Sequence, residues 1–167
     1  MNRGEDSWGA AAAVWVATFL LVAAMPAWWW PEGALPAPET SPLATETFLE
    51  RVDAMTAAHA TGERAGDIPV VHPPGGDVYL AAQRFLFTPA LELEAGQTYR
   101  LHVAAVDGMH GFNFPLADAD TMLIPGWETV MTLTPVAKGH YALQCNEYCG
   151  LEHSRMMGWV RVVARRE

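Results

Sequence analysis

Both cysteines of this chain lie in one short segment that also carries a histidine and a methionine. Cys145 and Cys149 are followed by His153 and Met156. Thiolate and thioether sulfurs, combined with imidazole, are ligands that favour copper over harder metals. Because two thiolates occur at one site, the segment predicts more than one copper ion.

Three other interpretations of this segment stay open. The positions 145, 149, 153 and 156 share one face of a helix, a disulfide could join the two cysteines in an oxidising compartment, and cysteine with histidine is also a zinc signature. Against these stand Gly150 with polar neighbours such as Asn146 and Glu152, which favour a loop. A disulfide leaves His153 unexplained, and zinc seldom uses Met156. Copper fits the residues best.

A second histidine, distant in sequence, could complete the site. His110 lies in the segment Asp107–Phe112, directly after a predicted strand over residues 98–106. Loops from different strands can converge at one end of a β-sandwich, where rigid strands hold ligands in place before metal binds. We therefore expect His110 to join the cysteine segment.

The elements that must position these residues are predicted to be short β-strands. From Asp77 onward, apolar runs alternate with turn residues, as is typical of a sandwich or barrel. The predicted strands cover residues 78–83, 90–94, 98–106, 112–114, 129–134, 139–144 and 158–164. Residues 77–167 are therefore predicted to form one mainly β domain.

The N-terminal part is predicted to cross a membrane once. After a tail over residues 1–9, residues 10–30 contain no charge, and at about 1.5 Å per residue a helix of this length reaches roughly 31 Å. A secretory signal peptide is the alternative. The tryptophans at 28–30, which suit a membrane interface, favour a transmembrane helix. The positive-inside signal is weak, and the large domain is placed on the periplasmic or outer side mainly by the expected copper chemistry.

Residues 31–76 are predicted to be a linker that contains a short amphipathic helix. Four prolines, at 31, 36, 38 and 42, favour extended chain. Residues 45–60 follow with apolar and acidic side chains on opposite faces, and Gly62 and Gly66 are expected to end this helix. His59 and His72 match no ligand spacing and are expected to be exposed to solvent.

The net charge excludes nucleic-acid binding as the leading function. The chain carries a formal charge of -9 at pH 7, whereas nucleic-acid binders use basic patches to neutralise phosphates. An acidic surface could steer a basic electron donor or simply maintain solubility.

With these residues in place, the sequence resembles the copper-A domain of subunit II of haem-copper oxidases. The resemblance covers about residues 78–163 and rests on Phe87-Thr88-Pro89 followed by Gly96, on Asp107–Phe112, and on the motif C-x-x-x-C-G-x-x-H-x-x-M over 145–156. It implies a cupredoxin-like Greek-key β-sandwich. The single predicted membrane helix looks more like the smaller B-type oxidases than the two-helix forms.

The resemblance also implies a ligand set for a binuclear copper-A centre. Cys145 and Cys149 would bridge two copper ions as thiolates. One copper each would bind His110 and His153. The set is completed by the Met156 thioether and the Glu147 backbone carbonyl. His102 and His140 match no ligand position.

The implied function is electron transfer at the cytoplasmic membrane. The domain would take electrons from a cytochrome c or another small carrier and pass them to haem in a separate catalytic subunit that reduces oxygen to water. The expected partners are that membrane subunit, the carrier and membrane lipid, with no nucleic acid. Met122 and Trp127 replace an acidic residue and an arginine of the larger oxidases, which keeps open a nitric oxide reductase subunit. A membrane-tethered copper-binding protein is a third possibility.

Overall fold

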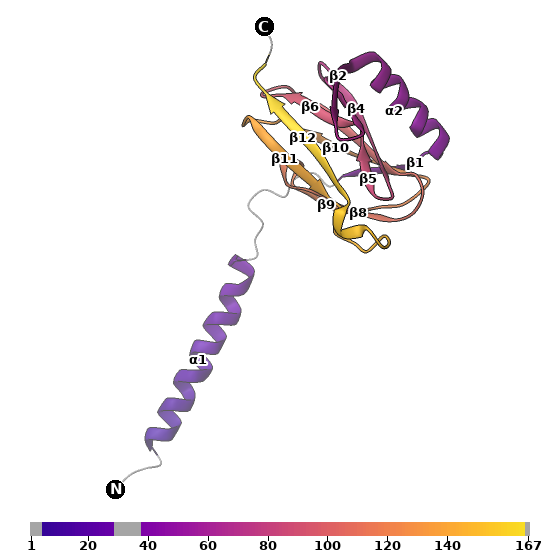
Figure 1. Cartoon of the computed structure of the whole chain (residues 1–167). Coiled ribbons are helices and arrows are strands. Elements are labelled where there is room, and N and C mark those ends of the chain that lie inside the picture. Colours follow the sequence, from indigo (N-terminus) through magenta and orange to yellow (C-terminus); the bar gives the residue numbers. More distant parts are fainter. Residues whose placement is uncertain (1–4, 29–37, 166–167) are drawn as a thin grey trace. The chain divides into compact units, whose positions relative to one another are not determined.

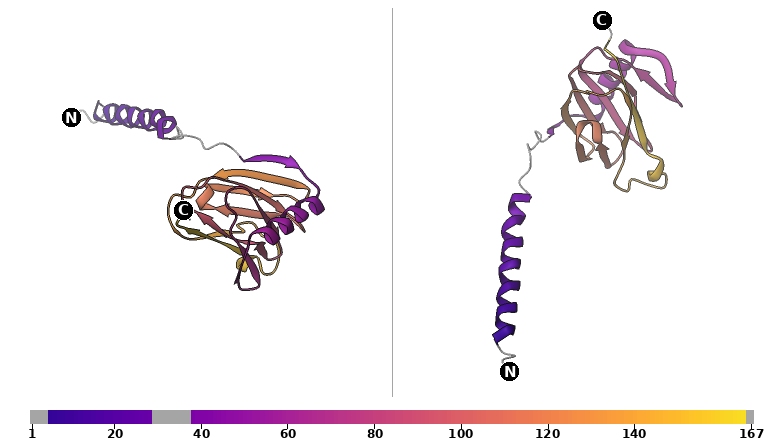
Figure 2. Two further views of the ribbon diagram at one scale, coloured as in Figure 1. Left: turned by 90° about the horizontal axis from the view of Figure 1, so that it is seen from above. Right: turned by 90° about the vertical axis from the view of Figure 1, so that its left-hand side faces the viewer.

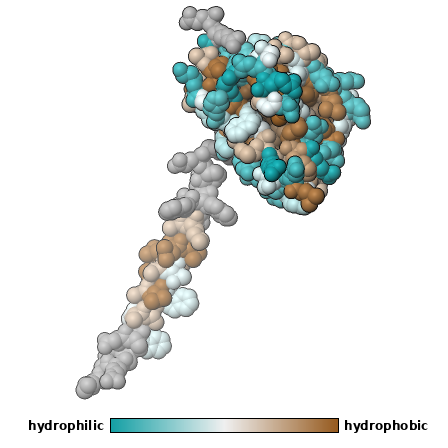
Figure 3. Space-filling view, viewed as in Figure 1, coloured by the Kyte–Doolittle hydropathy of each residue, from teal (hydrophilic) through white to brown (hydrophobic). Residues whose placement is uncertain are grey.

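The computed structural model describes residues 5–28 and 38–165, which form two compact units (Figure 1). The first contains helix α1 (Glu5–Trp28). Its residues Trp8–Met25 have a mean hydropathy of 1.9 and are not buried within the protein. The apolar side chains along this helix stand out in Figure 3. The expected membrane-length helix is therefore confirmed by length and composition.

The helix begins earlier than predicted. It includes Glu5 and Asp6, which precede the apolar run. Charged residues end a membrane span, but they are compatible with a helical backbone. Trp29 and Trp30 of the expected aromatic belt, and Pro31 and Pro36 of the expected spacer, lie outside the described residues.

The second unit is a sandwich of two β-sheets (Figures 1 and 2). Among the described residues, the five-stranded sheet has the order β1 (Glu39–Pro42), β10 (Trp127–Leu133), β7 (Tyr99–Ala105), β4 (Gly76–Gln83) and β5 (Leu86–Thr88). The seven-stranded sheet has the order β2 (Ala60–Ala65), β3 (Ile68–Val71), β6 (Ala90–Glu94), β12 (Met157–Val163), β11 (Gly139–Gln144), β8 (His110–Phe114) and β9 (Ala119–Leu123). The predicted mainly β, cupredoxin-like sandwich with one N-terminal helix is confirmed.

The core lies between the sheets, where alternate residues of facing strands meet. Leu80 of β4 and Val103 of β7 belong to the same buried cluster as Leu143 of β11 and Val160 of β12. Side chains that alternate across a strand place every second residue in this layer. The strands that line this core were predicted from the sequence because they are short apolar runs bounded by turn residues.

The domain begins well before residue 77, where the predicted linker was expected to end. Helix α2 (Thr45–His59) forms as predicted, but it is built into the domain. Its Phe48 and Val52 pack on Ala81 and Ala104. Those two residues alternate with the inward-facing ones, so α2 covers the outer face of the five-stranded sheet.

The chain leaves α2 directly into β2 at Ala60, before the glycines expected to end the helix. Strands β1 and β2 are exposed along almost their whole length. They add to edges of the two sheets through backbone hydrogen bonds, and such strands need no apolar alternation. This explains why their sequences did not predict them.

Three connections lie at one end of the sandwich. They are the short turn 84–85 after β4, the loop 106–109 after β7, and the segment 145–156 after β11. The parallel pairing of β4 with β7 aligns Ala82 with Ala105, and the amide of Cys145 donates to the carbonyl of Met156 at 3.1 Å. The segment 145–156, yellow in Figure 2, extends beyond the strand ends.

Candidate metal centre

The two cysteine sulfurs face each other inside the segment 145–156. Their Sγ atoms are 3.6 Å apart, and both residues are free cysteines. A disulfide requires about 2.05 Å between the sulfurs, so the disulfide alternative is not realised in this structure. Cys145 is only 1 % exposed, and Cys149 is partly buried.

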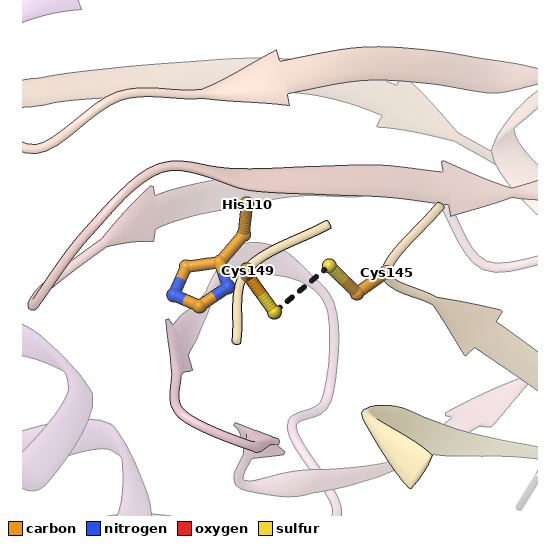
Figure 4. A group of neighbouring side chains, drawn as sticks. All are labelled: His110, Cys145 and Cys149. Atoms are coloured by element: carbon orange, nitrogen blue, oxygen red, sulfur yellow. Dashed lines mark hydrogen bonds between the residues drawn. The ribbon is translucent and has the colours of Figure 1, made fainter. Parts of the chain in front are cut away.

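His110 brings a third donor from the other loop. Its ring joins both sulfurs in a group whose ligand atoms all lie within 4.8 Å of one another (Figure 4). His110 is fully buried at the first position of β8. The predicted convergence of the two loops is therefore present.

The remaining predicted donors surround the same sulfurs. His153 Nδ1 lies 3.7 Å and Met156 Sδ 3.6 Å from Cys149 Sγ. The carbonyl oxygen of Glu147 lies 3.2 Å from Cys145 Sγ. The structure thus brings together every residue proposed as a ligand. The only helical turn within the segment is the 3-10 turn His153–Arg155, so the single-helix-face interpretation is wrong.

One ring nitrogen of His110 has no partner, which is the feature expected of a metal ligand. Its Nε2 lies 2.8 Å from Asp107 Oδ1. The buried Nδ1 has no hydrogen-bond partner. A carboxylate that accepts from one ring nitrogen leaves the lone pair of the other available to a metal. The donors present therefore fit a soft metal ion.

The electrostatics of the metal-free site follow from burial and from the two thiols. Burial raises the pKa of the Cys149 thiol to about 11, and the adjacent Cys145 adds to this rise. For Asp107, partial burial acts to raise the pKa, but hydrogen bonds from His110 and from the Arg84 amide outweigh it and leave the pKa below its ordinary value. Two neighbouring thiols resist ionisation until a cation compensates their charge, and thiol deprotonation accompanies metal binding.

Two glycines allow the loops to approach so closely. A Cβ on Gly111 would collide with the Asn146 side chain and would lie 2.6 Å from the amide nitrogen of Glu147. A Cβ on Gly150, which has φ +142°, would lie 2.9 Å from the ring of Phe85. The sequence interpretation missed Gly111 and also Asp107 as the partner of His110. The spacing Asp-x-x-His was the available signal.

The other histidines do not contribute to this site. His102 is buried and contacts Glu128 and Asp77. His72 was expected to be exposed, but its side chain is 13 % exposed and lies 3.0 Å from a Glu92 carboxylate oxygen. The prediction for His72 is wrong because strand β3 places the residue beside β6, which carries two buried glutamates.

Comparison with known proteins identifies the sequences that this chain resembles. The family described as cytochrome c oxidase subunit II, periplasmic domain, matches residues 79–163. Cytochrome c oxidase subunit 2 of Thermus thermophilus is 30 % identical over 118 residues, which span 68 % of this chain and 87 % of that protein. An alternative cytochrome c oxidase subunit 2 of Bradyrhizobium diazoefficiens is 31 % identical over 74 residues, 44 % of this chain and 27 % of that protein.

One solved structure supports the fold. A chain of a haem-copper terminal oxidase dimer, determined by cryo-electron microscopy, matches with a TM-score of 0.54 and 20 % identity. The match covers 96 % of this chain and all of the other chain. At this identity the match supports a shared fold, and the chemistry rests on the residues described above.

Proposed function

The chain belongs to the family of the periplasmic domain of cytochrome c oxidase subunit II, and from this membership we propose that it accepts electrons for a membrane terminal oxidase. The donor is a cytochrome c or a similar small carrier. The acceptor is haem in a separate catalytic subunit, which reduces oxygen to water. This chain transfers electrons and leaves the oxygen chemistry to its partner.

The observation that carries the proposal is a pair of sulfurs 3.6 Å apart with an imidazole nitrogen from each of two segments close by. A mononuclear blue-copper site uses one cysteine, whereas two suit a binuclear centre. Cys145 and Cys149 would hold the two copper ions through their thiolates, and His110 and His153 would each supply an imidazole nitrogen. The Met156 thioether and the Glu147 carbonyl complete the set.

A binuclear copper centre supplies reversible one-electron transfer, in which the electron is shared over both metals and the sulfurs. The protein's part is to keep the ligand positions constant between the two redox states. His110 and Met156 have no exposed surface, and Cys145 has almost none, so few water dipoles must reorient around them. The β-strands at the base of each loop restrict ligand movement.

We further propose that α1 anchors the chain in the cytoplasmic membrane, in contact with lipid, with the β-sandwich on the periplasmic or outer side. The support is its apolar window of 18 residues, which approaches the roughly 20 residues that span a bilayer. This arrangement makes the domain available to a soluble donor while it remains attached to a membrane complex.

The decisive experiment is electron paramagnetic resonance of the full chain, purified in detergent, loaded with copper and oxidised. We expect two copper ions per chain and one unpaired electron coupled to two copper nuclei. One tightly bound copper, or coupling to a single nucleus, would contradict the site assignment. Rapid loss of copper to a mild chelator would favour a copper-delivery protein.

The assignment to an oxidase is tested by its partner. Affinity purification of the full chain from its native membrane should recover a haem-bearing membrane subunit. The recovered complex should consume oxygen in the presence of reduced cytochrome c. Turnover with nitric oxide and none with oxygen would assign the chain to a nitric oxide reductase instead.

A further inference from the structure

The turn between β4 and β5 reaches both loops that carry the proposed ligands. Arg84 and Phe85 form this turn. The backbone N–H of Arg84 donates to Asp107 Oδ2 at 2.9 Å, while the other carboxylate oxygen of Asp107 lies 2.8 Å from His110 Nε2. The Arg84 amide is therefore connected to the proposed ligand His110 through a single residue, Asp107.

The side chain of Arg84 makes the second connection. Its Nε donates to the carbonyl oxygen of Cys149 at 3.2 Å, across 65 positions of sequence. The guanidinium also lies against Gly108, where a Cβ would come within 2.9 Å of Nη2. One residue thus contacts the loop before His110 and the segment that contains both cysteines.

Packing reinforces this placement. The neighbouring Phe85 ring packs against Gly150 and joins the buried core. The core therefore anchors the turn from which Arg84 extends.

We infer that Arg84 is a positioning residue for the proposed metal centre, which ties the His110 loop to the Cys149 loop and places a positive charge within hydrogen-bond distance of the Cys149 carbonyl. This inference rests on the proposed copper centre and adds a specific residue that controls it. Arg84 does not itself bind metal. It acts through the Cys149 backbone and, by its charge, on the redox equilibrium.

The two effects can be separated with Arg84→Met and Arg84→Lys in the copper-loaded full chain. Arg84→Met removes the guanidinium but keeps the apolar stem, and we expect copper transfer to a chelator to accelerate about 10-fold, the effect typical of losing an outer-shell contact. The reduction potential should fall, because a nearby positive charge favours the reduced, less positive centre. Arg84→Lys retains charge without the planar fork, so it should accelerate copper release but keep most of the potential.

Arg64→Met is the matched control, because Arg64 also donates from its guanidinium to a backbone carbonyl, that of Asp67, in a turn between β2 and β3. Arg64→Met should change neither the rate of copper release nor the reduction potential. Amide hydrogen exchange of the metal-free chain gives a readout without copper, and residues 147–153 should exchange faster in Arg84→Met than in Arg64→Met.

The inference is overturned if Arg84→Met and the unaltered chain have the same rate of copper release, the same reduction potential and the same amide hydrogen exchange. Arg84 is exposed, so the variants should fold, and circular dichroism of the metal-free chains checks this. If the unaltered chain binds no copper pair, the proposed function fails, and the hydrogen-exchange comparison still tests whether Arg84 joins the two loops.

Discussion

Two buried histidines in this domain differ in how their ring nitrogens are satisfied. His110, at the candidate metal centre, has Asp107 on Nε2 and no hydrogen-bond partner on Nδ1. His102, in the five-stranded sheet, has Glu128 2.9 Å from Nδ1 and Asp77 3.1 Å from Nε2. His102 also packs on the ring of Tyr79, with the centroids 4.7 Å apart.

The difference shows that burial alone does not identify a ligand. His102 is 6 % exposed and His110 is 0 % exposed, so both are core residues. A ring with two carboxylate partners joins parts of the fold, here β7 to β4 and β10. A ring held on one side only, with sulfurs near the other nitrogen, is prepared to bind a metal.

The largest effect should come from Cys149→Ser. A serine hydroxyl does not ionise near neutral pH and cannot replace a bridging thiolate, so the paired copper centre should be lost. Metal analysis and electron paramagnetic resonance of the full chain measure this directly. Two retained coppers that share one electron would show that Cys149 does not bridge them.

Removal of the carboxylate partner of His110 should lower copper affinity, whereas removal of a carboxylate partner of His102 should have no effect on copper affinity. Asp107→Ala leaves His110 Nε2 without its acceptor, and we expect copper affinity to fall by about 10- to 100-fold. Asp77→Ala, which removes the corresponding partner of His102, is the matched control and should leave affinity unchanged. Competition with a copper chelator measures both, and equal losses would contradict the distinction.

His102→Leu should lower the stability of the domain and leave copper binding unchanged. It leaves the buried Glu128 without its closest partner, and we expect the metal-free domain to lose about 2 kcal/mol of unfolding free energy. The copper content and spectrum should not change. Urea unfolding of the full chain in detergent, followed by circular dichroism, measures the loss. His140→Leu, at an exposed strand position, should unfold like the unaltered chain.

The smallest effect should be that of Met156→Leu. The two side chains have similar volume, so this buried position should tolerate the change. The reduction potential should shift, because a weak thioether ligand tunes it. Met131→Leu, at another buried methionine in the core, controls for packing. Redox titration that yields the same potential for all three chains would remove Met156 from the ligand set.

Much of the fold could be predicted because the strands that line the core are short apolar runs bounded by turn residues. The seven predicted strands correspond to β4, β6, β7, β8, β10, β11 and β12. Strands β1 and β2 have exposed, polar sequences and carried no such signal. They exist because sheet edges offer backbone hydrogen bonds, which do not depend on side-chain pattern.

The sequence by itself determined the chemistry of the site, because Cys145, Cys149, His153 and Met156 carry their donor atoms within one short segment. Only the tertiary structure decided how these donors are completed and held. His110 reaches the sulfurs because β8 pairs with β11, and its free nitrogen depends on Asp107. The Arg84 amide reaches Asp107 because parallel pairing brings the ends of β4 and β7 together. Such contacts depend on strand register between distant segments, which no local pattern of residues specifies.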